Sequence, residues 1–255
     1  GDGAAIAAET GIPVISDLRA LDVALGGQGA PIVPIGDKLL FGEFSYCLNI
    51  GGIANISARS ADKYVSFDIC PANRVLNLLA AKAGKVYDDG GAIAASGNVN
   101  PALLATLNNF PFYGEQYPKS LSNDFGVGVI YPLILQEESR TENALRTYTE
   151  HIALQVTAAV EQIKKNISPE TEPATMLVTG GGAFNTFLIQ SIREQVKQHN
   201  IELLVPDEKI IQYKEALVMA LIGVLRWREE NNVMSSVTGA MRNSVGGAIW
   251  MGQEA

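Results

Sequence analysis

Cysteine and histidine are scarce in this sequence, with two residues of each among 255. Two cysteines, Cys47 and Cys70, are too few for a disulfide framework, and their spacing does not match a metal-binding pair. His151 and His199 have no partner at metal-ligand spacing, so we interpret both as structural. We therefore expect no metal-ligating residues in this chain.

Long apolar runs and basic runs are also absent. No stretch of 18 apolar residues occurs, which argues against a membrane-spanning helix, and the first residues do not have the pattern of a secretory signal peptide. The net charge is −8, and no run of lysine or arginine indicates a nucleic-acid-binding face. We expect a cytoplasmic protein that binds neither membranes nor nucleic acids.

The sequence has the composition of a globular protein, with 47% hydrophobic and 18% charged residues. A chain of this length can bury a substantial core or form two lobes. Periodicity and turn residues predict alternating strands and helices, which indicates an α/β fold. Predicted strands include 13–16, 176–178, 201–205 and 243–250, and predicted helices include 4–8, 98–109, 143–165 and 213–228.

Residues 47–57, CLNIGGIANIS, predict a β-hairpin. Two apolar runs flank the pair Gly51-Gly52, and glycine accepts the positive φ angles that tight hairpin turns use. Glycines also allow backbone N–H groups to approach an anion closely. From these residues alone, an ordinary core hairpin and a ligand-binding turn are both open.

Residues 175–196 contain a second glycine turn. A short buried strand over 176–178 is followed by Gly180, Gly181 and Gly182 and then by an amphipathic helix that reaches Val196. A helix N-terminus at the glycines would combine unpaired N–H groups with the positive end of the helix dipole, which suits a phosphate or a nucleotide. A simple tight turn between strand and helix is the alternative.

Asp68 ends the predicted strand YVSFD and precedes a helix for which we expect Pro71 as the first residue. A carboxylate at this position can act as a general base on a bound water. It can equally serve as a helix N-cap that performs no chemistry. The residues alone leave both interpretations open.

The chain resembles the anhydro-N-acetylmuramic acid kinases, which belong to the superfamily of actin, heat-shock chaperones and sugar kinases. The residues that carry the resemblance occur in the family's order and cover nearly the whole chain. They are SDLRALDVALGGQGAPIVP (16–34), LNIGGIANIS (48–57), FD before Pro-x-Asn (67–73), YDDGGAIAASG (87–97), FP with YPKS (110–120), VTGGGAFN (178–185), EA (215–216) and SVTGAMR (236–242).

The resemblance implies an actin-like ATPase (ribonuclease H-like) fold, with a mixed sheet flanked by helices. Residues 1–45 would be the remainder of an N-terminal lobe and the crossover, and residues 46–255 would form the C-terminal lobe. The chain does not begin with Met, and the family's Gly/Ser/Thr/Asp-rich hairpin that wraps the ATP phosphates has no match in it. We therefore expect a fragment of a longer protein.

The resemblance also implies a reaction, in which ATP and Mg²⁺ serve to open 1,6-anhydro-N-acetylmuramic acid and phosphorylate its O6 during cell-wall recycling. The partner is a small amino sugar, and the family is dimeric, so a homodimer is expected. The implied roles are Asp68 as catalytic base, Gly51 and Gly52 at the phosphates, and Gly180, Gly181 and Gly182 at the adenosine. The implied substrate-binding residues are Asp17, Arg19, Asn73, Lys119 and Glu215.

The sequence departs from the family pattern directly after Asp68. Ile69, Cys70 and Ala72 stand where the family has Thr, Gly and Gly. Fewer glycines restrict the loop, and the missing hydroxyl removes a potential ligand contact. Two alternatives to the expected activity therefore stay open, namely a kinase for a different sugar and a non-catalytic homologue that binds a nucleotide.

Overall fold

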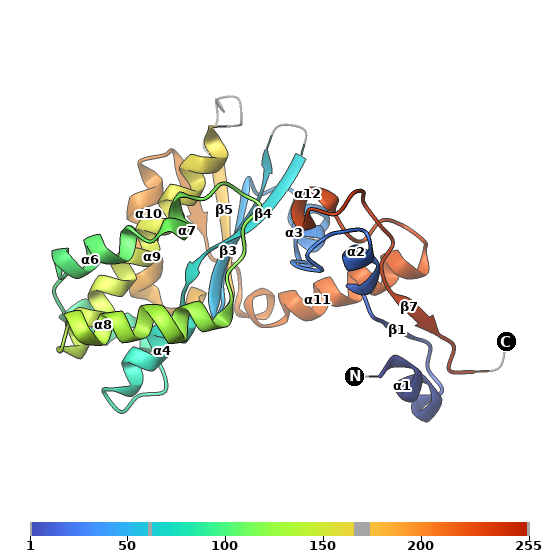
Figure 1. Cartoon of the computed structure of the whole chain (residues 1–255), viewed down its shortest axis with the longest axis horizontal. Helices are drawn as coiled ribbons and strands as arrows, with labels where there is room; N and C mark the ends of the chain where they lie inside the picture. The colour runs from blue at the N-terminus through green and yellow to red at the C-terminus, as the bar shows by residue number, and fades with distance from the viewer. Residues whose placement is uncertain (1, 61–62, 166–173, 254–255) are drawn as a thin grey trace. The chain divides into compact units, whose positions relative to one another are not determined.

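The computed structural model describes residues 2–60, 63–165 and 174–253, and the chain divides into two compact units (Figure 1). Unit 1 comprises Gly1–Gly42, Lys63–Val65 and Tyr213–Ala255, and unit 2 comprises Glu43–Asp62 and Ser66–Gln212. The C-terminal segment from Tyr213 thus groups with the N-terminal residues. The units reflect the density of contacts and do not assign lobes, so the division into lobes 1–45 and 46–255 remains a prediction.

Unit 1 is mainly helical, with a two-stranded antiparallel sheet of β1 and β7. Its elements are α1 (Gly3–Thr10), β1 (Val14–Ser16), α2 (Ala20–Ala24), α3 (Pro34–Leu40), most of α11 (Glu208–Trp227), α12 (Ser235–Thr238) and β7 (Ala248–Trp250). A small core joins α3, α11 and α12 through Ile35, Val218, Ile222 and Val237. These contacts hold α11 against the first 40 residues of the chain.

Unit 2 contains the larger sheet and its flanking helices. Its strands are β2 (Tyr46–Ile50), β3 (Ile53–Ser60), most of β4 (Lys63–Pro71), β5 (Ala174–Thr179) and β6 (Ile201–Leu204). Its helical elements are α4 (Asn73–Ala81), η1 (Asp89–Gly91), α5 (Ala92–Ser96), α6 (Pro101–Asn108), α7 (Pro111–Gly114), η2 (Phe125–Ile130), α8 (Tyr131–Glu137), α9 (Thr141–Lys164), η3 (Gly181–Phe184) and α10 (Thr186–Lys197).

In the described residues, the sheet of unit 2 has the strand order β4-β3-β2-β5-β6. Strand β2 is its centre, antiparallel to β3 and parallel to β5, and β6 is parallel to β5. Leu48 and Ile50 of β2 are fully buried, as are Ile56 of β3 and Val178 of β5. The predicted hairpin and the strands at 176–178 and 201–205 are present, and the α/β class with a mixed sheet flanked by helices is confirmed. The strand predicted over 243–250 is shorter, because β7 covers only Ala248–Trp250.

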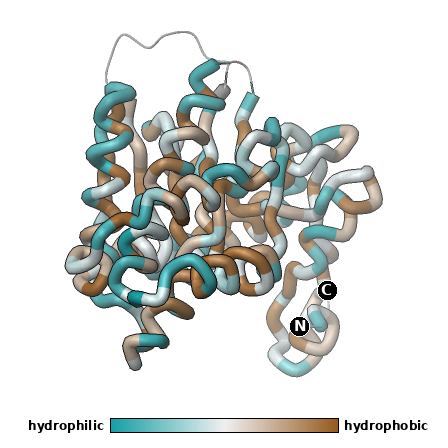
Figure 2. The backbone as a smooth tube through the Cα atoms, turned by 60° about the vertical axis from the view of Figure 1, so that its left-hand side comes forward, coloured by the Kyte–Doolittle hydropathy of each residue, from teal (hydrophilic) through white to brown (hydrophobic). Residues whose placement is uncertain are grey.

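Helix α9 is the main support of the sheet in unit 2. It packs against α4, α5, α6, α10 and β3. Its apolar stripe, which includes Leu145, Ile152 and Val156, is buried, and burial of each such side chain stabilises the fold by about 1.5–3 kcal/mol. In Figure 2, brown and teal stretches alternate along the tube, because hydrophobic and hydrophilic residues follow one another along the chain.

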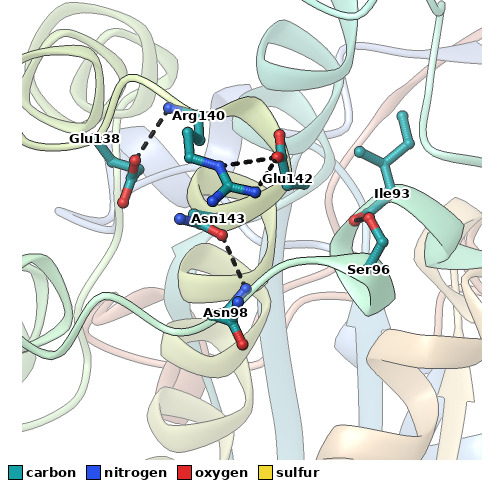
Figure 3. A network of polar contacts seen from close by, with 7 residues as sticks. All are labelled: Ile93, Ser96, Asn98, Glu138, Arg140, Glu142 and Asn143. Atoms are coloured by element: carbon teal, nitrogen blue, oxygen red, sulfur yellow. Dashed lines mark hydrogen bonds and ion pairs between the residues drawn. The ribbon is translucent and has the colours of Figure 1, made fainter.

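The N-terminus of α9 is held by a network of polar contacts (Figure 3). The Arg140 backbone N–H donates to Glu138 at 3.0 Å, and its guanidinium contacts Glu142 at 2.7 Å. The side chain of Asn143 accepts a hydrogen bond from the Asn98 backbone at 2.9 Å. This bond ties the α5–α6 connection to α9, so both segments keep a defined position on unit 2.

The predicted starts of α4 and α11 are wrong. Pro71 is the last residue of β4, where its carbonyl accepts a hydrogen bond from the Tyr148 hydroxyl at 2.7 Å, and α4 begins at Asn73. Helix α11 begins at Glu208 and not at 213, so Glu215 lies two turns inside the helix. Proline fixes φ but does not exclude an extended conformation at the end of a strand, which explains the first error.

Apolar residues lie on nearly all sides of α11, but only one side of the helix is buried. Val218 and Ile222 are buried, whereas Leu217, Val224 and Trp227 are 45, 52 and 54% exposed. Periodicity shows that a helix has apolar residues on several sides, but not how many of those sides are covered. The core side of α11 is therefore a single stripe.

Candidate active site

The Gly51-Gly52 turn joins β2 to β3 and also holds the start of α4. The backbone N–H groups of Ala72 and Asn73 donate to the carbonyls of Gly52 and Gly51 at 2.8 and 3.0 Å. The Asn73 side-chain amide donates to the Ile50 carbonyl at 2.9 Å. The N-terminal N–H groups of α4 are thus used within the protein, and Asn73 fixes the hairpin turn.

The expected reason for glycine in this turn is only partly right. Neither Gly51 nor Gly52 has a positive φ angle. A β-carbon at Gly52 would meet no heavy atom closer than Arg74 Cβ at 3.9 Å. The glycines therefore leave this side of the turn open, which is the property that a ligand approaching the backbone requires.

The three glycines after β5 lie against the end of β2. Gly180 has a φ of 82°, and a β-carbon there would lie 2.7 Å from the Ile50 carbonyl oxygen. A β-carbon on Gly181 would lie 3.4 Å from the side-chain nitrogen of Asn73. The two glycine turns, which are far apart in the sequence, therefore meet at Ile50 and Asn73.

The helix after these glycines was predicted to begin at the glycines themselves, and this prediction is wrong. Gly181–Phe184 form the short helix η3, and α10 begins at Thr186. Asn185 caps α10 by accepting a hydrogen bond from the Leu188 N–H at 3.0 Å. The positive end of the α10 dipole therefore lies beyond η3 and not at the glycine turn itself.

A pocket of about 450 Å³ opens beside the triple-glycine turn. Its lining residues are Asn73, Leu76, Asn77, Tyr87, Asp88, Asp89, Gly90, Gly181, Gly182, Phe184 and Asn185. Two of them are unusually exposed aromatic side chains, Tyr87 at 59% and Phe184 at 47%. This size lies in the range of small-molecule sites, and exposed rings beside a glycine turn suit a flat base.

The loop that carries Tyr87 is docked onto the start of α10, which follows the triple-glycine segment. The Asp88 carboxylate accepts hydrogen bonds from the Ile93 and Ala94 N–H groups at 2.8 and 2.9 Å. The Thr186 hydroxyl donates to the Gly90 carbonyl at 3.0 Å. Sequence reasoning recognised this loop but missed Tyr87 and Phe184 as site candidates. The available signal was an aromatic residue next to a glycine-rich stretch on each segment.

Asp68 lies inside β4 and does not cap a helix, since α4 begins five residues later and its N-cap is Ala72. The helix-cap interpretation is therefore wrong. Burial raises the pKa of the Asp68 carboxyl, and the hydrogen bond from the Leu121 N–H at 2.8 Å opposes this shift. A raised pKa brings a carboxylate closer to the range in which it accepts a proton effectively.

Lys119 follows the loop that contains α7, and its ammonium is turned toward that helix. Nζ donates to the carbonyls of Phe112 and Tyr113 at 3.1 and 3.4 Å and lies 4.7 Å from the centre of the Phe112 ring. Burial lowers the pKa of Lys119, while the nearby Glu115 opposes this shift. Two of the three N–H groups of the ammonium are thus used within the protein.

The remaining candidate residues lie in unit 1, whereas Asp68, Asn73, Lys119 and the glycines lie in unit 2. Asp17 has a left-handed backbone with a φ of 54° and accepts a hydrogen bond from the Ser16 hydroxyl. The Arg19 guanidinium donates to the Gly29 carbonyl. Glu215 is exposed on α11.

A buried aspartate in unit 1 joins two of the segments that carry the resemblance. Asp22 is fully buried and accepts hydrogen bonds from the Thr238 hydroxyl and the Gly29 N–H, both at 2.7 Å. These bonds join residues 16–34 to the 236–242 segment. The signal was present in the sequence, because both segments carry the resemblance, but only the fold shows that they touch.

Comparison with known proteins shows to which family this chain belongs. The model of the anhydro-N-acetylmuramic acid kinase family matches residues 1–252. Anhydro-N-acetylmuramic acid kinases from Saccharophagus degradans, Bacillus thuringiensis and Haemophilus influenzae are 34, 32 and 32% identical to it. Each alignment covers 98% of this chain and 68 or 69% of the relative. The chain belongs to the anhydro-N-acetylmuramic acid kinase family.

Similarity to solved structures is weaker. The activator of 2-hydroxyisocaproyl-CoA dehydratase from Clostridium difficile, solved with bound ADPNP, is similar with a TM-score of 0.43 and 18% identity. The match covers 73% of this chain and 62% of that chain. The fold class of this family member therefore rests on its own sheet and helices.

The three positions after Asp68 at which this chain departs from the family pattern are interior. Ile69, Cys70 and Ala72 are 3, 0 and 0% exposed. Burial raises the pKa of the Cys70 thiol, and the charge of Asp68 adds to this effect, so the side chain is a packed small residue and not a reactive thiolate. Ile69 lines a second pocket of about 210 Å³ together with Phe67, Tyr113, Lys119 and Gln155.

Two features are absent from the part of the chain that the structure describes. No group of three or more His, Cys, Asp or Glu side chains is arranged so that it could hold a metal ion. Among the described helices, none combines the length and the apolar character that crossing a membrane requires.

Proposed function

We propose that this member of the anhydro-N-acetylmuramic acid kinase family uses ATP to open 1,6-anhydro-N-acetylmuramic acid and to phosphorylate O6. The product is N-acetylmuramic acid 6-phosphate, and the setting is cell-wall recycling. Family membership over residues 1–252 carries this proposal. The meeting of two glycine turns beside a pocket, and a carboxylate with a raised pKa on the same sheet, support it.

The nucleotide is proposed to occupy the side of unit 2 where the glycine turns meet. Gly180, Gly181 and Gly182 would lie against the adenosine, with Tyr87 and Phe184 as additional contacts. Gly51 and Gly52 would lie against the phosphates, because their open backbone allows close approach.

Mg²⁺ is proposed as the accompanying cation. Protein sites commonly bind Mg²⁺ through only one or two carboxylates, with substrate phosphates and waters completing the shell. Mg²⁺ on the phosphates would neutralise charge that develops during transfer.

Asp68 is proposed as the catalytic base. Its carboxylate would take a proton from a water molecule whose oxygen bonds to the anomeric carbon. The bond between that carbon and O6 breaks, and O6 then attacks the γ-phosphorus and displaces ADP. The raised pKa of Asp68 supports this assignment, since a pKa nearer to neutral pH makes the carboxylate a stronger proton acceptor.

The sugar is proposed to contact Asp17, Arg19, Asn73 and Glu215, as the family pattern implies. Asn73 has a further function, because its amide nitrogen already holds the Ile50 carbonyl. Direct contact between Lys119 and the substrate has less support, since its ammonium donates to two backbone carbonyls. An actin-like fold with lobes 1–45 and 46–255, a homodimer and a cytoplasmic location complete the proposal.

A non-catalytic nucleotide-binding homologue is the second candidate. It is favoured by the buried, non-glycine residues after Asp68, where the family has a hydroxyl and two glycines. A kinase for another sugar is the third candidate, because Ile69 changes a pocket-lining position.

Sugar-dependent ADP release by the full-length protein, with Mg²⁺ and ATP, tests these candidates. We expect turnover with the anhydro sugar, and a loss of about 10²- to 10⁴-fold in Asp68→Asn. Asp124→Asn, at an exposed carboxylate, is the matched control and should retain activity. Nucleotide binding without turnover would favour the non-catalytic candidate. Turnover only with another amino sugar in a substrate panel would favour the third.

A further inference from the structure

The carboxylate of Asp68 depends on one short segment for its orientation. The Asp68 backbone N–H donates to the Lys119 carbonyl at 3.1 Å, and the Leu121 N–H donates to Asp68 Oδ2 at 2.8 Å. Within the described residues, no other hydrogen bond reaches this carboxylate. A displacement of residues 119–121 would therefore turn Asp68 as well.

The side chain of Lys119 fastens this segment to α7. Its ammonium donates to the Phe112 and Tyr113 carbonyls in the last residues of the helix, where lysine side chains often bind. The aromatic ring of Tyr117 also stacks on Phe67, the neighbour of Asp68, with ring centres 5.1 Å apart. Residues 111–121 are thus closed into a compact loop whose far end holds Asp68.

Helix α7 is in turn anchored to the buried centre of α9. His151 is fully buried, and burial lowers its pKa to about 3, so its ring is neutral near pH 7. Asn108 Oδ1 accepts from the Gln155 amide at 2.9 Å and contacts His151 Nδ1 at 2.7 Å, which makes Nδ1 the donor. His151 Nε2 then accepts from the Tyr113 hydroxyl at 3.1 Å.

We propose that Lys119 is a positioning residue of the proposed kinase reaction. Its ammonium holds the loop on α7, so that the backbone at Lys119 and Leu121 aims the Asp68 carboxylate at the water that it deprotonates. This inference rests on the proposed function and changes the role of Lys119, which acts through Asp68 and not through contact with sugar or phosphate.

The experiment compares Lys119→Met and Lys119→Arg with the control Lys164→Met. Lys164 also donates to a backbone carbonyl, that of His199 at 2.7 Å, but at the far end of α9. We expect Lys119→Met to lower kcat about tenfold to hundredfold, as small misplacements of catalytic groups do. The KM values for sugar and ATP should stay within about twofold of the wild type.

Lys119→Arg and Lys164→Met are the two controls. Lys119→Arg keeps the cation and its donors, so we expect it to recover most of kcat. Lys164→Met should leave kcat and KM unchanged. A KM for sugar that rises about tenfold in Lys119→Met at constant kcat would overturn the proposal, because that pattern marks lost ground-state binding.

A second readout is independent of turnover. Hydrogen exchange at the Leu121 amide, measured without substrates, should accelerate at least about tenfold in Lys119→Met and stay unchanged in Lys164→Met. Unchanged exchange in Lys119→Met would overturn the positioning role. If the wild type shows no sugar-dependent turnover, the proposed function is refuted. Faster exchange in Lys119→Met would in that case still support the contact between Lys119 and the Asp68 segment.

Discussion

Gly182 lies so close to Ile50 that a β-carbon built on it would stand 2.2 Å from Ile50 Cγ2. Real β-carbons do not approach a neighbour so closely, so only glycine fits without movement of the end of β2. By contrast, a β-carbon built on Gly52 in the neighbouring turn would stand 3.9 Å from Arg74 Cβ. The two glycine turns of the site are therefore constrained in different ways.

This difference predicts opposite results for two alanine substitutions. Gly182→Ala should lower the free energy of unfolding by about 1–3 kcal/mol, because overpacking displaces Ile50. Gly52→Ala should change it by less than about 0.5 kcal/mol, as expected for an open position. Urea unfolding of both variants is the measurement. If Gly182→Ala destabilises the protein as little as Gly52→Ala does, then β2 moves and relieves the contact between residue 182 and Ile50.

The raised pKa of Asp68 predicts how activity depends on pH. The base must be deprotonated to act, so kcat/KM should fall as the pH decreases through its pKa. Because burial raises that pKa, the acidic limb should lie above the usual carboxyl range of about 4. The pH profile of sugar-dependent ADP release measures this limb. A limb at the ordinary carboxyl value would contradict the assignment.

The same pKa shift predicts that the ionised Asp68 carboxylate, which activity requires, lowers the stability of the folded protein. A folded-state pKa above the unfolded value means that the folded protein binds the proton more tightly, so ionised Asp68 costs stability at neutral pH. Asp68→Asn should therefore raise the melting temperature near pH 7. The gain should vanish as the pH falls below about 4, where the wild-type carboxyl is protonated in both states. Calorimetry at several pH values checks this.

The exposed rings of the 450 Å³ pocket predict a contribution to nucleotide binding. Tyr87→Ala and Phe184→Ala should each weaken ATP binding, since stacking of a base on an aromatic side chain contributes about 1–3 kcal/mol. Trp227→Ala, which removes another half-exposed ring in unit 1, should leave ATP affinity unchanged. Titration calorimetry with ATP is the test, and unaltered affinity in both pocket variants would remove these residues from the site.

The buried bonds of Asp22 predict a structural effect in unit 1. Thr238→Val removes the hydroxyl that donates to the carboxylate at 2.7 Å and should cost about 1.5–3 kcal/mol of unfolding free energy. Thr106→Val, at an exposed threonine whose hydroxyl bonds only to its own helix, should change stability by less than about 0.5 kcal/mol. Chemical unfolding distinguishes the two, and equal values would contradict a special role for Asp22.

Local patterns in the sequence determined the elements and the family. The apolar runs around Gly51-Gly52 specify a hairpin, and the short apolar run before Gly180 specifies a strand, because side-chain alternation and glycine turns act over a few residues. The order of the motifs was enough to indicate the anhydro-N-acetylmuramic acid kinase family, which the comparisons bear out.

Only the tertiary structure decided what each candidate side chain touches. It placed Asp68 inside β4 and not at a helix cap, turned the Lys119 ammonium onto α7 carbonyls, and brought Asp22 to Thr238. The Asp22 contact joins residues 216 positions apart, and the other two outcomes depend on how neighbouring segments pack. Sequence periodicity describes one element at a time, whereas burial and hydrogen bonding between elements are set when they pack together.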